Sequence, residues 1–401
     1  MDRLSSLRGR TMIKEAFRSE LYVPREEPLK DLLGWVRQQS PEFRLRSLIG
    51  PAGIGKSWFL AHLYRQLNDT NHCLVLWMDL GVEALHPKSG KQLPEMASPG
   101  GRNEWLDRAV EEAGQCCQIQ QLANGPFSER FRAFISALCE KCPPGSVIIL
   151  LIDGFDEMSN PSNRDYFQEH IFAGFLGESC TRVVLARRDE YMLTHPYLRW
   201  NEETVLLSSL KPEQQVDQLV RRKDILKQAL QQENIGERRA QLRALFPNDI
   251  DPNVIYQLES VTSAVAEAIL ERITPYASAN PLINTCLFSH AATRIPAGFT
   301  AADLGSCMRE IITRAGLKSA DTEVLKKIVQ LLPLNWTARE LRDALSLDVN
   351  HPDLERLFGS GVIAHLSGTA RYTTDKGIYR LISDYLAQSP KLNGTSLEAA
   401  L

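Results

Sequence analysis

Long apolar runs are missing from this sequence. No segment approaches the length of a membrane-spanning helix, and the basic N-terminal segment contains no apolar core of a secretory signal. The formal net charge is only -3 at pH 7, so no overall field draws the chain to a membrane surface or to nucleic acid. Internal repeats and low-complexity segments are absent as well. We therefore expect a cytoplasmic protein with no membrane partner, and we do not expect nucleic acid as a partner.

The cysteine pattern does not suit a structural metal site. The chain has 8 cysteines and no export signal, so reduced thiols are the expected state. Cys139 and Cys142 have the spacing of half a zinc site, but Cys116 and Cys117 are badly spaced for the other half and no histidine lies near. We expect buried or surface thiols at these positions.

Five short apolar segments alternate with helical segments in the first half of the chain. At 401 residues the chain is too long for one ordinary core, and about two to four domains are expected. Strands that alternate with helices predict an α/β domain over residues 21–210, with a parallel sheet sandwiched by helices. The predicted strands are Phe43–Ile49, Cys73–Leu80, Val147–Ile152, Arg182–Ala186 and Thr204–Leu207.

The rest of the chain has a different pattern. Residues 211–318 contain helical segments with no strand-like run between them, which predicts an all-α helical domain. Residues 319–390 have the order helix, helix, helix, hairpin, with Thr337 as the cap of the second helix, and this order is that of a winged-helix domain. Residues 1–20 are expected to be a lead-in and residues 391–401 a tail.

The segment Gly50–Ser57 reads GPAGIGKS and matches the pattern G-x-x-x-x-G-K-[ST], between a predicted strand and a predicted helix. Its glycines let successive backbone N–H groups point at phosphate oxygens, and the helix that follows presents its positive end to the same charge. Lys56 is expected to reach the β- and γ-phosphates, and the Ser57 hydroxyl to bind Mg²⁺. The predicted nucleotide-binding residues of this segment are Gly50, Pro51, Ala52, Gly53, Ile54, Gly55, Lys56, Ser57 and Trp58.

Acidic and basic residues follow two other predicted strands. Asp153 comes directly after Val147–Ile152 and is expected to hold Mg²⁺. One of the next acids should orient and deprotonate the attacking water, with Glu157 as the first choice and Asp156 as the second. Arg187 and Arg188 follow Arg182–Ala186, and of the two we prefer Arg188 as the arginine that meets the γ-phosphate. A solvated turn is the alternative for the acids, and the phosphate-binding pattern upstream disfavours it. An exposed basic turn stays open as the alternative for the arginines.

These motifs together resemble the STAND branch of AAA+-related P-loop ATPases, near the NACHT and NB-ARC groups. Leu150–Glu157 (LLIDGFDE) is similar to the NACHT Walker B pattern, and Leu185–Glu190 (LARRDE) resembles the sensor segment that carries the arginine of the family. The resemblance covers most of the chain. It implies ATP or ADP and Mg²⁺ as cofactors, and a slow, regulatory hydrolysis of ATP.

Two further segments carry a weaker resemblance to the same family. Tyr22–Glu26 (YVPRE) resembles the segment that contacts the adenine side, which implies that Val23 and Arg25 bind nucleotide there. Asn280-Pro281-Leu282 resembles an element of the helical domain whose proline, here Pro281, packs near adenine.

The chain also departs from the family pattern. Pro24 replaces a glycine, and Ala186-Arg187 replaces Thr-Ser. Thr374 lies where many members have a histidine that binds ADP. His365 is close to it in the sequence, but a histidine in the wing of such a domain is more often exposed to solvent.

The resemblance implies a nucleotide-dependent switch that oligomerises with ATP and works with a separate sensor or effector protein in signalling. An alternative is an AAA+ ATPase of the origin-recognition or loader type with a DNA-binding winged helix, although the expected recognition helix at His351–Gly361 is acidic. A metabolic or transport ATPase is a third reading.

Replacing Lys56 with alanine tests the phosphate assignment. Because the ammonium is expected to neutralise the β- and γ-phosphates, Lys56→Ala should abolish nucleotide binding in isothermal titration calorimetry. An unchanged ATP affinity would contradict the assignment.

Overall fold

The computed structural model describes most of the first 293 residues and a smaller part of the rest. The described residues are 17–51, 53–68, 73–80, 126–157, 161–188, 192–245, 255, 258, 264–293, 336–337, 339–340, 343, 363–365, 371–374, 377 and 379–380. The chain divides into two compact units. The first comprises Met1–Phe17, Pro24–Gly50 and Lys56–Leu207, and the second comprises Arg18–Val23, Pro51–Gly55 and Ser208–Leu401.

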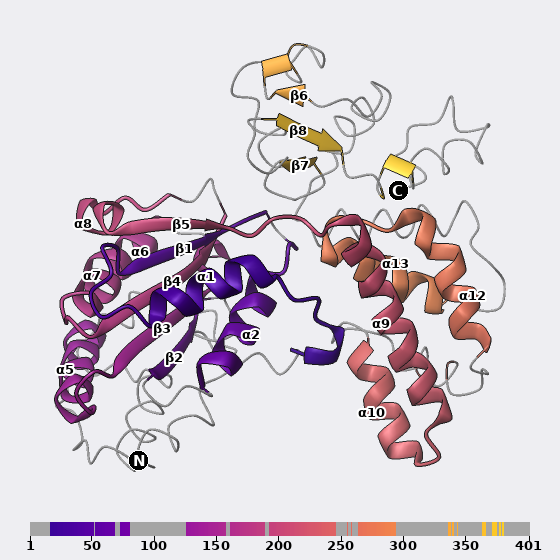
Figure 1. The fold of residues 1–401 in the computed structure, drawn as a ribbon, viewed down its shortest axis with the longest axis horizontal. Coiled ribbons are helices and arrows are strands. Elements are labelled where there is room, and N and C mark those ends of the chain that lie inside the picture. The colour runs from indigo at the N-terminus through magenta and orange to yellow at the C-terminus, as the bar shows by residue number, and fades with distance from the viewer. Residues whose placement is uncertain are drawn as a thin grey trace. The chain divides into compact units, whose positions relative to one another are not determined.

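The first unit is built on a parallel five-stranded sheet with the order β2-β3-β4-β1-β5 (Figure 1). All of its strand pairs are parallel. The five predicted strands are thereby confirmed, each within a few residues of its expected bounds. The strands are β1 (Leu45–Ile49), β2 (Cys73–Asp79), β3 (Val147–Asp153), β4 (Thr181–Arg187) and β5 (Glu202–Leu206).

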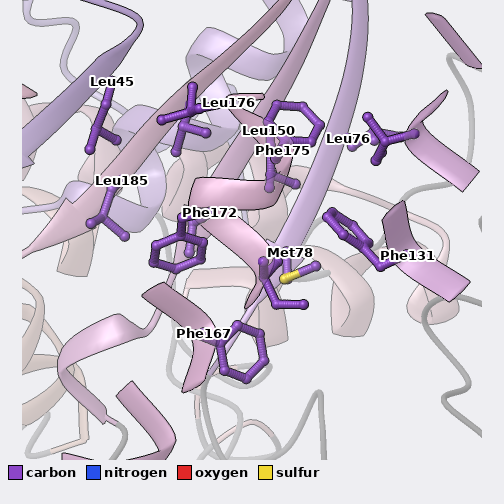
Figure 2. Close-up of a cluster of buried hydrophobic side chains, with 14 of the residues drawn as sticks. Leu45, Leu76, Met78, Phe131, Leu150, Phe167, Phe172, Phe175, Leu176 and Leu185 are labelled. Atoms are coloured by element: carbon purple, nitrogen blue, oxygen red, sulfur yellow. The ribbon is translucent and has the colours of Figure 1, made fainter. Parts of the chain in front are cut away.

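Side-chain alternation along the strands divides the sheet into two faces. On one face, Leu45, Leu150 and Leu185 belong to a cluster of buried side chains (Figure 2) that also contains residues of α5 (Phe127–Lys141). The same cluster takes in side chains of the π-helix η5 (Phe167–Phe172) and the short α7 (Ala173–Phe175). This face is therefore closed by the segment between β3 and β4, together with α5.

The opposite face is covered by α1 (Glu26–Val36) and α2 (Lys56–Asn68). Arg46, which alternates with Leu45, pairs with Asp31 of α1 at 2.6 Å and lies over the Trp35 ring. The predicted helix at Ser57–Leu67 is confirmed as α2. The helical residues between β3 and β4, which begin with α6 (Pro161–Tyr166), and the short α8 (Pro196–Trp200) were not expected from the sequence.

The second unit contains α9 (Pro212–Gln231), α10 (Ile235–Leu245), α12 (Ala264–Ile273) and α13 (Pro281–Thr293), with a short turn of helix η6 (Thr274–Tyr276). The short helix η2 (Ser19–Leu21) also contacts α9. The α9 helix buries one stripe of side chains and packs against α10, α12 and α13. The described segments from 211 to 293 contain no strand, as the sequence predicts.

A small antiparallel sheet with the order β6-β8-β7 lies further along the chain. The predicted hairpin is confirmed, because β7 (Ile363–His365) pairs with β8 (Arg371–Thr374). β6 (Trp336–Thr337) adds a third strand. Thr337 forms a reciprocal cap with Glu340, whose N–H donates to the Thr337 hydroxyl at 3.1 Å. The predicted helices at 322–332 and 353–359 lie outside the described residues.

The thiols of Cys139 and Cys180 are in contact, 3.0 Å apart. Burial is the main cause that raises the pKa of the Cys139 thiol well above its usual range, which makes this thiol a poor nucleophile and metal ligand. Within the described ranges, no group of three or more His, Cys, Asp or Glu side chains is placed to hold a metal ion. Cys116 and Cys117 lie outside those ranges. None of the described helices is long and apolar enough to cross a membrane.

The face of the sheet that carries the cluster should dominate the stability of the first unit. Leu150→Ala in the centre of β3, where the side chain is fully buried, should lower the free energy of unfolding by about 2–5 kcal/mol in urea denaturation. Leu206→Ala is the matched control, because Leu206 on the edge strand β5 is 45% exposed and its loss should change stability by less than about 0.5 kcal/mol. Equal losses for the two variants would contradict this account of the core.

Candidate functional site

The segment that follows β1 is the predicted phosphate-binding loop, and two of its glycines have left-handed backbone conformations. Gly53 and Gly55 have φ values of 73° and 97°, in the region that residues with a Cβ rarely adopt. At the start of the segment, the Gly50 N–H donates to the Arg187 carbonyl at 3.3 Å, so the loop leaves the sheet beside β4. It ends at Lys56, where α2 begins. Ala52 lies outside the described residues.

The first turn of α2 carries the predicted cationic and hydroxyl groups. Lys56 folds back along the loop, and its Nζ donates to the Gly50 carbonyl at 2.8 Å. Ser57 is half-buried in the same turn, which contains no acidic residue, so the positive end of the helix dipole is not compensated from within the turn. Trp58 packs edge-on against Phe17, with ring centroids 5.5 Å apart. This contact gives Trp58 a packing role beside its predicted place in the nucleotide site.

Asp153 lies at the same edge of the sheet as the loop and on the same face as α2. Ile152 belongs to the buried cluster on the opposite face, so Asp153 alternates to the face that α2 covers. The register places Ile152 of β3 beside Leu185, and Ile49 of β1 beside Arg187, so only β4 separates the two strand ends. Two strand spacings amount to about 10 Å. The Asp153 side chain is buried, and Gly154 turns the chain away with a φ of 73°.

A second acidic residue ends the neighbouring strand. Asp79 is the register partner of Asp153 at the end of β2. Asp79 was not among the predicted site residues, although it shares with Asp153 the signal of an acid at the end of an apolar strand. Carboxylate and hydroxyl oxygens are the ligands that Mg²⁺ prefers, so the residues Ser57 and Asp153 fit this ion in their chemistry.

The residues after Asp153 form a short turn of helix, η4 (Phe155–Glu157). Phe155 is fully buried and packs against Phe172, which anchors the turn. Asp156 pairs with Arg188, whose Nε lies 2.9 Å from an Asp156 oxygen, and the Asp156 side chain is only 8% exposed. The backbone of Glu157 closes the turn, while its side chain lies outside the described atoms. The structure therefore joins two predicted site residues in one ion pair.

The two adjacent arginines have different environments. Arg187 is buried and donates to Glu202 from Nε at 3.2 Å and from Nη2 at 2.9 Å. Arg188 keeps 29% of its side chain exposed at the edge where the loop lies. Arg187 therefore has a structural role, and Arg188 is the arginine that a ligand could reach, as the sequence analysis preferred.

Pro281 is the first residue of α13, and Asn280 before it acts as the helix cap. The Asn280 Oδ1 accepts the Leu282 N–H at 2.9 Å, and this arrangement is a common way to begin a helix. Within the second unit, a Cβ placed on Gly55 would lie 4.0 Å from Pro281 Cγ. Pro281 thus lies near the phosphate-binding loop, and its contact with adenine stays a prediction.

Val23 and Arg25 are both buried, just before α1. Their adenine-side role stays a prediction too. In the small sheet, Thr374 pairs with Ile363 and His365 with Tyr372.

Comparison with known proteins yields solved structures only. No protein-family model matches the chain, and no curated protein matches it. Cdc6p from Pyrobaculum aerophilum is similar at 15% identity and a TM-score of 0.36, over 96% of this chain and 98% of that one. Aeropyrum pernix Orc1 in complex with DNA is similar at 14% identity and a TM-score of 0.36, over 92% of this chain and 94% of that one. The Thermotoga maritima RuvB Holliday junction branch migration motor is similar at 15% identity and a TM-score of 0.34, over 94% of this chain and 98% of that one. These TM-scores are too low to assign this chain a role.

The exposed position of Arg188 leads to a prediction about nucleotide discrimination. Arg188→Ala should weaken ATP binding about tenfold, since a charge-assisted contact to the γ-phosphate is lost, and should change ADP binding less than about twofold. Calorimetry with both nucleotides measures this, with Arg199→Ala of the exposed α8 surface as the control. Equal losses for ATP and ADP would refute a sensing role.

Proposed function

We propose that this chain binds Mg-ATP and hydrolyses it to ADP and phosphate. The observation that carries the proposal is the shared position of the two halves of the site. The loop with Gly53 and Gly55 in left-handed conformations opens α2, and Asp153 ends a strand on the face that α2 covers. Ligands of open α/β sheets bind at this carboxyl edge of the strands.

Each residue has a separate task in the proposed reaction. Backbone N–H groups of the loop and the Lys56 ammonium bind the β- and γ-phosphates, while Ser57 and Asp153 hold Mg²⁺, which neutralises phosphate charge. Glu157 takes a proton from the water that attacks the γ-phosphorus, and the bond to the bridging oxygen breaks so that ADP leaves with that oxygen. Arg188 stabilises the charge on the transferred group.

The ion pair with Arg188 supports Glu157 over Asp156 as the base. An Asp156 oxygen already lies 2.9 Å from the Arg188 Nε in an ion pair, so Asp156 is better placed to orient Arg188 than to receive a proton from water.

Amide substitutions at the two acids test this assignment. Glu157→Gln should keep ATP affinity and lower the hydrolysis rate by about a hundredfold or more, because the amide cannot accept the proton. Asp156→Asn, the matched control, should keep more of the rate. Phosphate release and calorimetry measure the two quantities. Normal turnover in Glu157→Gln, with loss in Asp156→Asn, would transfer the role of base to Asp156.

DNA binding is the output that we place first for this proposed ATPase. The sheet β6-β8-β7, with the reciprocal cap of Thr337 and Glu340 and helical backbone at residues 339–340 and 343, supports a winged-helix domain. The acidic character of residues 351–361, which lie outside the described residues, counts against DNA contact at that segment. The departures at Pro24, Ala186 and Thr374 weaken the resemblance to the switch family.

Fluorescence anisotropy with a labelled duplex tests the DNA output. We expect binding that tightens with a non-hydrolysable ATP analogue and weakens steeply between about 50 and 200 mM salt. No binding at low salt, with or without nucleotide, would exclude this output.

A STAND-type switch, with a sensor or effector protein as partner, is the second candidate. The contact between loop residues 51–55 and the start of α13 favours it, because nucleotide at this loop would be coupled to the helical unit. Such a switch should have a larger molar mass with the ATP analogue than with ADP, as measured by size-exclusion chromatography with light scattering. An unchanged mass, together with DNA binding, would contradict the switch and support the DNA output.

A further inference from the structure

A buried polar network connects α9 to the start of α13. The Asn284 side chain is fully buried, and both its amide oxygen and its amide nitrogen form hydrogen bonds. Its Oδ1 accepts the Ser278 N–H at 2.7 Å, and its Nδ2 donates to Gln218 Oε1 at 2.9 Å and to the Ser278 carbonyl at 3.0 Å. The Gln218 Nε2 in turn donates to the Pro281 carbonyl at 3.3 Å. The first turn of α13 is thus bound to α9 by directional contacts.

Arg222 of α9 extends the network with a buried positive charge. Its Nη1 donates to the Leu245 carbonyl at 2.7 Å and its Nη2 to the Thr285 hydroxyl at 2.9 Å. The Thr285 hydroxyl then donates to the Pro281 carbonyl at 2.9 Å. Burial lowers the pKa of Arg222 to about 10, so the guanidinium stays charged at neutral pH. A buried charge whose hydrogen-bond acceptors are neutral is unfavourable for stability by itself, which points to a positional role.

The turn that this network fixes meets the phosphate-binding loop inside the same compact unit. The Leu282 N–H, shared with the Asn280 cap, also donates to the Gly53 carbonyl at 3.3 Å. A Cβ placed on Gly53 would lie 2.7 Å from Leu282 Cβ and 2.8 Å from Asn280 Oδ1. At its other end the Gly53–Ile54 peptide is held as well, since the Ile54 N–H donates to the Pro51 carbonyl at 3.5 Å. The contact therefore fixes the orientation of one peptide of the loop.

We propose that Gln218, Asn284 and the Arg222–Thr285 pair are positioning residues for nucleotide binding. They hold the first turn of α13 against Gly53, and this turn keeps the loop in the conformation that binds phosphate. Pre-organising a loop lowers the entropy lost on binding, so the network supports affinity without touching the nucleotide. This inference rests on the proposed ATPase function, and it adds residues that lie far from the loop in the sequence to those on which nucleotide binding depends.

Thr285 offers a matched pair of variants in the full-length protein. Thr285→Val keeps the shape of the side chain and removes the hydroxyl that joins Arg222 to the Pro281 carbonyl, whereas Thr285→Ser keeps the hydroxyl. Asn284→Ala cuts the other branch. Ser289→Ala is the control for α13 as a whole, because the Ser289 hydroxyl is buried in the same helix and has no hydrogen-bond partner among the described residues.

Hydrogen exchange without nucleotide is the first measurement, because it does not depend on any activity. In Thr285→Val and Asn284→Ala, the peptide that covers residues 51–55 should exchange about threefold or more faster than in the wild type, and Thr285→Ser and Ser289→Ala should match the wild type. Unchanged exchange at residues 51–55 in both network variants would overturn the proposal, even if thermal stability falls.

Nucleotide binding is the second measurement. The network variants should raise the KM for ATP and the Kd for ADP about threefold to tenfold with kcat nearly unchanged, since they alter ground-state binding and not the chemistry. A fall in kcat alone, or unchanged affinities, would overturn the positioning role. Faster loop exchange in a protein whose wild type binds no ATP would instead refute the proposed function and leave the contact standing as a structural one.

Discussion

Burial of β3 and β4 on both faces is the constraint on which the rest of the site depends. The side chains of both strands from Ile148 to Asp153 and from Thr181 to Arg187 are buried. A shift of β4 by one residue would turn Arg182, whose guanidinium donates to the Trp35 carbonyl of α1, toward the apolar cluster on the other face. This fixed register brings Asp153 to the face covered by α2 and sets β4 between it and the loop. The site geometry is therefore a consequence of core packing.

The loop itself is set by local backbone requirements and by a close neighbour. Positive φ values at Gly53 and Gly55 exclude most other residues on conformational grounds. At Gly53 the start of α13 adds a second reason, because a side chain there would collide with Leu282. The polar network beneath that turn ties the conformation of the loop to the packing of α9 against α13.

Local patterns predicted the sheet, the loop at residues 50–57 and Asp153, because continuous apolar runs and a glycine-rich turn each consist of residues that are neighbours in the sequence. The helical segment from Pro161 to Phe175 was not predicted, because a π-helix interrupts the usual helical spacing of its apolar residues. The pairing of Arg188 with Asp156 and the bonds from Gln218 to Asn284 join residues far apart in the sequence. Such contacts follow from tertiary packing, which no local pattern encodes.

The most direct test of the account is a crystal structure of the complex with a non-hydrolysable ATP analogue and Mn²⁺ in place of Mg²⁺. The anomalous signal of the metal is expected between the Ser57 hydroxyl and the Asp153 carboxylate, with the triphosphate along residues 50–57. A metal and triphosphate bound elsewhere on the protein, with this edge of the sheet empty, would contradict it.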